Sequence, residues 1–141
     1  MNISTRIYCG IHNDCKTIRE AVFMAEQGFK NEFDDIDERA YHAVLYDGKK
    51  PVATGRLFSD KNGDFIIGRI AVMKEYRGLS LGSRVVRELE KQAEDIGAKS
   101  ISLSAQCRVQ EFYEKIGYTA TDDIHDDEGC PHVTMTKIFN R

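Results

Sequence analysis

The sequence is poor in the features that mark several classes of protein. It has two prolines and no tryptophan in 141 residues, and it shows neither a repeat of fixed period nor a proline-rich linker. Hydrophobic residues make up 41% of the chain and charged residues 30%, which excludes a disordered, fibrous or low-complexity protein. Because domains cluster near this length, we expect a single globular domain over residues 1–141.

Long apolar segments and an excess of basic charge are also lacking. No run of 18 apolar residues is present, and no charged-then-apolar leader opens the chain. Lys and Arg number 20 against 23 Asp and Glu, for a net charge of -3, which argues against the broad basic surface that nucleic acid or an anionic membrane requires. We therefore predict a cytoplasmic protein with neither as a partner, in which any anion-binding site is local.

The cysteines do not suggest a disulfide framework or a metal site. Cys9, Cys15, Cys107 and Cys130 include no CxxC pair, and without a secretory signal we expect reduced thiols. Cys9, His12 and Cys15 are spaced like zinc ligands, but no second ligand pair completes a four-coordinate site. We predict that no metal is bound.

Hydrophobic periodicity predicts a mixed α/β sheet with helices on its faces. The predicted strands span residues 5–9, 41–47, 51–58, 65–72, 99–104 and 132–139. The predicted helices span 13–25, with Asn13 or Asp14 as N-cap and Gly28 as the stop, then 81–96 and 108–116. Two hairpin turns make 41–72 an antiparallel meander, and the helical crossover makes 65–72 and 99–104 parallel neighbours. The acidic stretch 122–128 is interpreted as a solvated loop.

The segment MKEYRGLSLGS, residues 73–83, joins an apolar strand to the start of the longest helix. Unpaired backbone N–H groups at a helix N-terminus favour a phosphate. Gly78 and Gly82 allow close backbone approach, and Arg77 adds a fixed positive charge. The segment is neither a P-loop nor a dinucleotide-binding fingerprint. Taken alone, its glycines are equally consistent with a tight strand-to-helix corner.

This segment and its surroundings resemble a known family. Residues 68–106, followed by EFYEKIGY, resemble the acetyl-CoA-binding core of the GNAT N-acetyltransferases, whose signature Q/R-x-x-G-x-G/A matches residues 77–82 except that Ser80 replaces the central glycine. IREAVFMAEQGF, YHAVL, ATGRLF, LSAQ and GCPHVTMTK are similar to the ElaA-like branch, so the resemblance covers nearly the whole chain. It implies a mixed, mostly antiparallel sheet of six to seven strands, with about four helices on its faces and a splayed parallel strand pair.

The resemblance also implies an acetyl-CoA site. The pantetheine would pair with the backbone of Ile70, Ala71 and Val72 as an added strand does. Gln106 and Phe112 would flank the other side of the cofactor. Arg84 and Arg87 are interpreted as solvated surface charges rather than nucleotide contacts. The pyrophosphate would meet the backbone amides of Arg77, Gly78, Leu79, Ser80, Leu81, Gly82 and Ser83.

Ser80 is the main departure from the signature. A serine disfavours the positive φ that glycine adopts, so this position requires a negative φ or some backbone strain. Its hydroxyl could instead cap the helix or bond a phosphate oxygen. The serine in place of the central glycine is therefore expected to affect the affinity of the protein for acetyl-CoA.

The activity implied by the resemblance is transfer of an acetyl group from acetyl-CoA to a primary amine, by direct attack, on a small molecule or a peptide terminus. Tyr113 occupies the place of the family's general acid, and a tyrosine with a pKa near 10 is protonated at neutral pH. The Val72 N–H is the implied oxyanion contact. Glu26 is the favoured general base over His42 and Glu75, with deprotonation through a water chain as an alternative. His132 is interpreted as a structural residue.

Two other functions compete with this one. Ser80 and the absence of an unambiguous base motivate a non-catalytic acyl-CoA-binding sensor or interaction module. Covalent transfer through Cys107 is disfavoured because the one close cation, Arg108, should point away from the thiol. Acceptor specificity is assigned to residues 27–41 and the acidic loop, which leaves the acceptor amine unidentified. The residues do not decide the oligomeric state, and a homodimer is left open.

Overall fold

A computed structural model describes residues 1–28, 33–60, 62–127 and 129–139. Its centre is a seven-stranded sheet in the order β1-β2-β3-β4-β5-β7-β6, in which only β4 and β5 are parallel. The predicted mixed, mostly antiparallel sheet is confirmed. The strands are β1 (Ile3–Cys9), β2 (Tyr41–Asp47), β3 (Lys50–Ser59), β4 (Phe65–Val72), β5 (Ser100–Gln106), β6 (Thr119–Asp127) and β7 (Cys130–Ile138).

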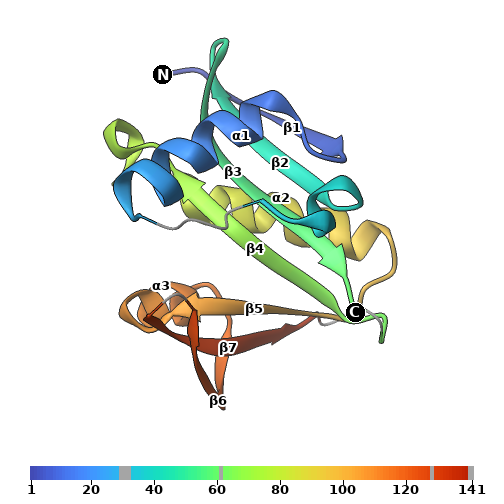
Figure 1. Cartoon of the computed structure of the whole chain (residues 1–141). Helices are drawn as coiled ribbons and strands as arrows, with labels where there is room; N and C mark the ends of the chain where they lie inside the picture. The colour runs from blue at the N-terminus through green and yellow to red at the C-terminus, as the bar shows by residue number, and fades with distance from the viewer. Residues whose placement is uncertain (29–32, 61, 128, 140–141) are drawn as a thin grey trace.

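Helices cover both faces of the sheet. In Figure 1, α1 lies in front of strands β2 to β4, α2 lies behind them, and α3 lies at one end of β5. The α-helices of the described ranges are therefore three, against the four or so that the resemblance implies, and short helical turns supplement them. They are α1 (Asn13–Arg19), its π-helical continuation η1 (Glu20–Glu26), α2 (Leu81–Asp95), α3 (Gln110–Lys115) and the 3-10 turns η2 (Asp35–Glu38), η3 (Lys74–Tyr76) and η4 (Cys107–Val109).

The start of α1 differs from the prediction. Its N-cap is His12, with extended backbone angles and a ring Nδ1 that accepts from the Asp14 N–H at 3.1 Å. The imidazole nitrogen thus takes the place of the short Asn13 or Asp14 oxygen that the sequence favoured. The predicted stop is confirmed, because the helix is capped at Gln27 and Gly28 follows with φ +79°.

The core has one part on each face of the sheet. Val85 and Leu89 of α2 pack against Leu57 and Ile67 on one face, and Cys15, Ile18 and Val22 pack against Val44 and Ala71 on the other. Gly55 allows α2 to lie close to β3, because a Cβ there would stand 2.7 Å from Val85 Cγ1. All four cysteines are free thiols.

Strands β4 and β5 separate after a short paired stretch. They pair only at Phe65–Ile101, Ile66–Ser102 and Ile67–Leu103. Just beyond, the β3–β4 register shifts at a bulge, and Arg69 adopts φ +55°. A bulge bends its strand and raises the local twist, so the two halves of the sheet diverge toward α3 and the end of η1 (Figure 1). The predicted splayed parallel pair is confirmed.

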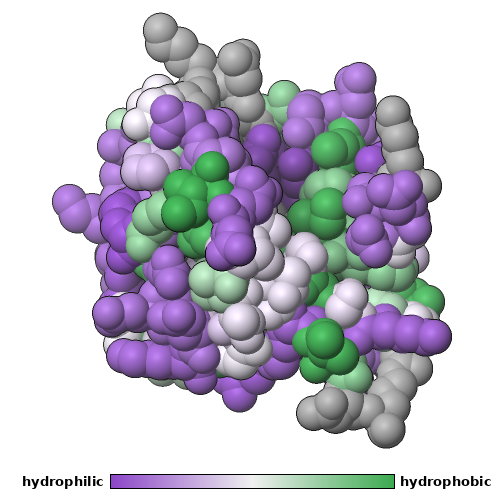
Figure 2. All heavy atoms as spheres, turned by 90° about the horizontal axis from the view of Figure 1, so that it is seen from below, coloured by the Kyte–Doolittle hydropathy of each residue, from purple (hydrophilic) through white to green (hydrophobic). Residues whose placement is uncertain are grey.

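The acidic stretch predicted as a loop lies in a strand as far as the structure describes it. Residues 122–127 belong to β6, which pairs with β7 at the edge of the sheet with an irregularity between Ala120 and Ile124. An edge strand with exposed side chains needs only backbone partners, so its sequence lacks the hydrophobic alternation of a half-buried strand. The face seen from below in Figure 2 is accordingly largely hydrophilic, with hydrophobic side chains in separate small groups. Glu128 lies outside the described residues.

A buried ionic network holds the segment around η2 against the α1 side of the sheet. Asp37 accepts from Arg19 at 2.7 Å and from Arg56 at 2.9 Å, and Arg56 also bonds Asp34 at 2.7 Å. His42 Nε2 donates to the Asp37 carbonyl at 2.9 Å. Burial raises the pKa of Asp37, but the hydrogen bonds from Arg19, Arg56 and the Asp34 N–H outweigh it and lower the pKa to about 2. The segment around η2 is thereby anchored by buried charges.

Candidate active site

The phosphate-loop candidate lies at the wide end of the opening between β4 and β5. A Cβ on Gly82, in the first turn of α2, would lie 3.5 Å from Phe112 Cζ and 3.8 Å from Val72 Cγ2. These distances are ordinary van der Waals contacts, so the end of β4, the start of α2 and α3 lie next to one another at Gly82. The fold brings together three residues that the resemblance assigns to the cofactor.

Beyond Ile67, one edge of β4 faces the opening without a partner strand among the residues that the structure describes. Its other edge pairs with β3 at Thr54–Ala71 and Ala53–Val72, whereas its pairing with β5 ends at Ile67. Apart from the Val72 carbonyl, which accepts from Arg77 Nε at 3.1 Å, the backbone polar groups of residues 70–72 on this edge are available to an extended ligand, as in strand addition. This is the geometry that the pantetheine prediction requires.

Ser80 has a strained backbone, and its hydroxyl does not cap α2. It lies in the left-handed region with φ +61° and ψ +22°, and its side chain makes no capping hydrogen bond to α2. Gly78, two residues earlier, has φ +81°. The loop thus keeps a backbone suited to glycine, with a serine at the central position, and the strain costs about 1 kcal/mol.

Replacing Ser80 by glycine should therefore raise the free energy of unfolding. We expect a gain of about 0.5–1 kcal/mol, because glycine adopts φ +61° without the Cβ clash but loses more backbone entropy on folding. Urea unfolding of wild type and Ser80→Gly measures the difference. A matched Ser83→Gly change, inside the first turn of α2, should lower stability instead; a destabilised Ser80→Gly protein would contradict the strain.

Arg77 is engaged in three contacts beside this loop. Its Nη1 and Nη2 donate to the two carboxylate oxygens of Glu26 at 2.6 and 2.7 Å, and its Nε donates to the Val72 carbonyl at 3.1 Å. The hydrogen bonds from Arg77 lower the pKa of Glu26, and a lower pKa makes this carboxylate a weaker base. The predicted base and the predicted phosphate arginine thus contact each other.

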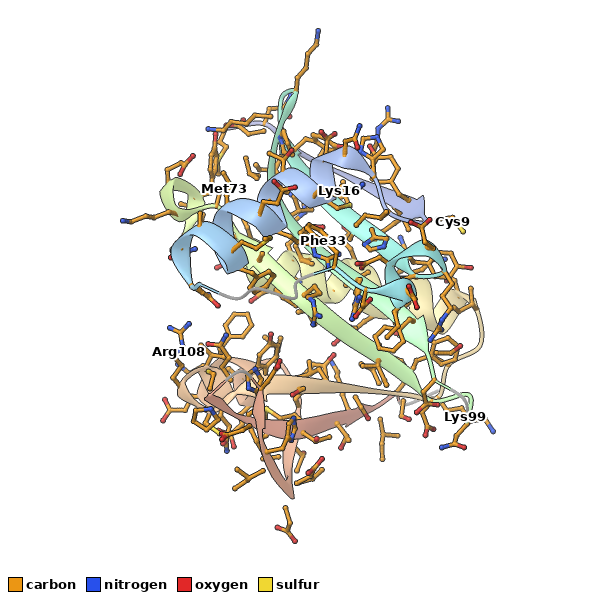
Figure 3. The ribbon with its side chains drawn as sticks, in the orientation of Figure 1. Cys9, Lys16, Phe33, Met73, Lys99 and Arg108 are labelled. Atoms are coloured by element: carbon orange, nitrogen blue, oxygen red, sulfur yellow. The ribbon has the colours of Figure 1, made fainter. Side chains whose placement is uncertain are left out.

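Two neighbouring side chains at the end of η1 contact residues on the two sides of the opening. Glu26 contacts Arg77 of the β4–α2 loop, and its neighbour Gln27 accepts from Gln106 Nε2 at 3.2 Å at the end of β5. Gln106 Oε1 accepts from Arg108 Nε at 2.6 Å, and Figure 3 shows Arg108 beside the opening, across from the end of η1. Sequence reasoning missed Gln27, because its contact joins residues 79 positions apart and no local pattern signals it.

Tyr113 lies on α3 with 8% of its surface exposed. Its ring packs edge-on against Phe112 at 5.0 Å and Tyr118 at 5.9 Å between centroids. Burial raises the pKa of Tyr113 to about 12, so the hydroxyl carries its proton throughout the neutral range. The side chain is positioned as a neutral donor next to Phe112.

The other candidates are placed elsewhere or are otherwise occupied. Glu75 is exposed and pairs with Lys50 at 3.2 Å. His42 is 1% exposed within the ionic network, and burial lowers its pKa. Arg84 Nη2 donates to the Ile3 carbonyl at 3.5 Å, toward β1. His12 caps α1 while Cys15 is buried in the core, and within the described residues no three His, Cys, Asp or Glu side chains are grouped so that they could hold a metal ion.

Known proteins share the sequence pattern of this chain. A family model described as the acetyltransferase (GNAT) domain matches residues 12–139. The chain belongs to the GNAT acetyltransferase family. The uncharacterized N-acetyltransferase YjcF of Bacillus subtilis is 38% identical over 127 residues, 88% of this chain and 90% of that protein. This GNAT chain is an acetyltransferase, and the family resemblance drawn from its motifs is confirmed.

Solved structures share the fold of this GNAT domain. An N-acetyltransferase candidate from Lactobacillus plantarum is 30% identical, with a TM-score of 0.88 over 96% of this chain and 97% of that one. Escherichia coli ElaA is 23% identical, with a TM-score of 0.85 over 96% and 99%. A GNAT acetyltransferase from Elizabethkingia anophelis, solved with acetyl-CoA bound, is 14% identical with a TM-score of 0.75 over 98% and 99%. Within the described ranges of this GNAT protein, no helix is long and apolar enough to cross a membrane.

Proposed function

We propose that this acetyltransferase uses acetyl-CoA to acetylate a primary amine, on a small molecule or a peptide terminus, by direct attack. The observation that carries the proposal is the unpaired edge of β4, which leads directly into the glycine-containing turn and the N-terminus of α2. An extended pantetheine and a pyrophosphate need these two features in that order. The acetyl-CoA bound to the Elizabethkingia anophelis protein of the same fold supports the choice of cosubstrate.

The residues of this chain would hold the cosubstrate through backbone and charge. Ile70, Ala71 and Val72 would pair with the pantetheine, with Gln106 and Phe112 on its other side. The positive end of the α2 dipole would face the phosphates, and Arg77 stands beside them. The amides proposed to bind the pyrophosphate are those of Arg77, Gly78, Leu79, Ser80, Leu81, Gly82 and Ser83.

Acetyl transfer needs a stabilised oxyanion and a proton for the departing thiolate. We assign the first role to the Val72 N–H and the second to the Tyr113 hydroxyl. Acetyl-CoA supplies the activated acetyl group when bound. With its pKa raised to about 12, Tyr113 is protonated at neutral pH, so its hydroxyl is present as a donor when charge develops on the sulfur, although the raised pKa makes it a weaker acid.

The proposed function predicts that acetyl-CoA binds to the isolated protein. Isothermal titration should show one site, and Arg77→Gln should weaken it about tenfold by removing one charge-assisted contact. Arg6 lies on β1 at the far edge of the sheet, and Arg6→Gln is the matched control that should bind normally. A folded protein that shows no heat with millimolar acetyl-CoA would overturn the proposal, whereas binding without turnover across an amine panel would favour the acyl-CoA sensor.

The substitution Glu26→Gln tests whether this carboxylate acts as the general base or only as the ion-pair partner of Arg77. Because Glu26 neutralises Arg77 beside the phosphate site, its removal should tighten acetyl-CoA binding about fivefold and change kcat by less than about threefold. Titration calorimetry and initial rates measure the two effects. If the turnover rate instead fell about 100-fold with unchanged affinity, Glu26 would be the general base, as the sequence favoured.

A further inference from the structure

We propose that His132 is the general base of the reaction, with Nε2 as the atom that takes a proton from the acceptor amine. The inference rests on the proposed N-acetyltransferase function and deepens it. The sequence favoured Glu26 and interpreted His132 as a structural residue. Three observations about the ring of His132 lead to a different assignment: its place, its tautomer and its exposed nitrogen.

His132 lies on β7, one strand beyond β5, level with the end of β5 at the wide end of the opening. It is the direct cross-strand partner of Gln106 on β5 and of His125 on β6. Directly opposed residues of antiparallel strands place their side chains on the same face, so the imidazole stands on the face where Gln106 reaches Gln27 of the η1 end. That is the face of α1, from which an acceptor would approach a thioester held between β4 and β5.

The tautomer of the neutral ring follows from one contact. His132 Nδ1 lies 2.8 Å from the Cys130 carbonyl. A carbonyl oxygen only accepts, so Nδ1 must carry the hydrogen and donate it. In the neutral ring the lone pair is then on Nε2, which is the form a general base requires.

The same nitrogen is the accessible part of a nearly buried ring. His132 is 6% exposed overall. Nε2 forms no hydrogen bond within the described part of the chain, yet it does not number among the buried atoms that lack a partner. It is therefore not fully buried, and the contact of Nδ1 with the Cys130 carbonyl holds the ring in place before an acceptor arrives.

Polar groups of β5, β6 and β7 surround the ring of His132. The ring of His125 stacks at 6.0 Å between centroids and 22° between planes. His125 Nε2 contacts Ser104 Oγ at 2.9 Å, and its Nδ1 lies 3.6 Å from Asp123 Oδ1. Thr134 Oγ1 donates to the other Asp123 oxygen at 2.7 Å. The contacts of His125 with Ser104 and Asp123 hold its ring against that of His132.

The proposed step balances its protons and electrons. His132 Nε2 takes one proton from the acceptor ammonium, and the nitrogen lone pair forms the C–N bond as the carbonyl π pair moves to oxygen. The Val72 N–H stabilises that oxygen until the pair returns and the C–S bond breaks. Tyr113 gives its proton to the sulfur and regains one from the new amide nitrogen. His132 releases its proton to solvent, so one proton is released for each ammonium acetylated.

The test uses His132→Asn in the full chain. The asparagine amide can still donate to the Cys130 carbonyl, but it has no basic nitrogen. At pH 7 we expect kcat/KM for the amine to fall about 100-fold, with the Kd for acetyl-CoA within twofold of wild type. His12→Asn, which changes a histidine on the α1 N-terminus and keeps a good capping residue, is the matched control with unchanged rates.

The pH dependence distinguishes a base from a structural residue. Wild-type kcat/KM should decline at acid pH, because a protonated base cannot take a proton from the amine. In His132→Asn the decline of kcat/KM at acid pH should be absent. The difference in kcat/KM between the variant and the wild type should become smaller toward high pH, where the amine is already neutral. A structural role would lower the rate by the same factor at every pH. His132→Ala with added imidazole should regain part of its rate, which covers the case in which the asparagine variant folds poorly.

The outcomes separate this inference from the function on which it rests. An active wild type with an equally active His132→Asn, or with a pH-independent loss and no rescue by imidazole, overturns the base assignment and leaves the acetyltransferase function intact. A wild type that acetylates no amine in a broad panel overturns both. A pH-dependent loss with rescue supports both.

Discussion

Tyr113→Phe should lower kcat about 100-fold while leaving the Kd for acetyl-CoA within a factor of two. The change deletes one hydroxyl from a side chain that is 8% exposed and keeps its packing against Phe112 and Tyr118. General-acid catalysis contributes about 10²–10⁴-fold, and the thiolate would then have to take its proton from water. Steady-state rates with a saturating amine, together with calorimetric titration, measure the two quantities.

Tyr8→Phe is the control for this variant. Tyr8 also bonds through its hydroxyl, to Tyr46 at 2.6 Å, but it lies on β1 away from the opening. Removal of the Tyr8 hydroxyl should leave kcat unchanged. Because the pKa of Tyr113 is raised to about 12, wild-type kcat should show no loss of the acid between pH 7 and 10. An unchanged rate in Tyr113→Phe would remove this residue from the acid role.

Asp37→Ala should lower the free energy of unfolding by about 3–5 kcal/mol. Asp37 is 2% exposed and accepts from Arg19 and Arg56, which are 1% and 4% exposed. Its loss leaves buried guanidinium groups without one of their carboxylate partners, which costs more than the pair contributes. Urea unfolding measures the change. Asp35→Ala, at an exposed neighbouring position, should differ by less than about 0.5 kcal/mol, and a similar small effect at Asp37 would contradict the network.

The Asp37 carboxylate should also make the free energy of unfolding of the wild type depend on pH in the acid range. Folding lowers its pKa from 3.8 to about 2, so its contribution is present above pH 3.8 and is lost as the pH falls from there to about 2. A shift of this size corresponds to about 2 kcal/mol. Denaturant unfolding between pH 5 and 2 should therefore show a steeper decline in the wild type than in Asp37→Ala.

Several elements could be predicted from local pattern alone. The limits of β2 and β4 agree with the structure, and α2 ends within one residue of its prediction. These segments bury one face or both, so hydrophobic spacing marks them directly. The loop prediction for β6 was wrong, because a solvent-exposed edge strand is held by backbone bonds that leave no trace in hydrophobicity.

The candidate site was predictable where its residues are close in sequence. Residues 70–83 form one strand, turn and helix start, and the signature within them identifies the loop. The contacts of Glu26 with Arg77 and of Gln27 with Gln106 were not predictable, since they join residues 51 and 79 positions apart. The tautomer of His132 likewise depends on where the Cys130 carbonyl lies in the folded chain.

The sequence by itself determined the family and the strands and helices that bury a face, and it indicated the candidate phosphate loop, because these depend on periodicity and on short runs of residues. The tertiary structure decided which charges meet. It turned Glu26 toward Arg77, buried Asp37 between two arginines and left one nitrogen of His132 exposed. Charge and proton affinity depend on distance and desolvation, which are set only when remote segments of the chain pack together.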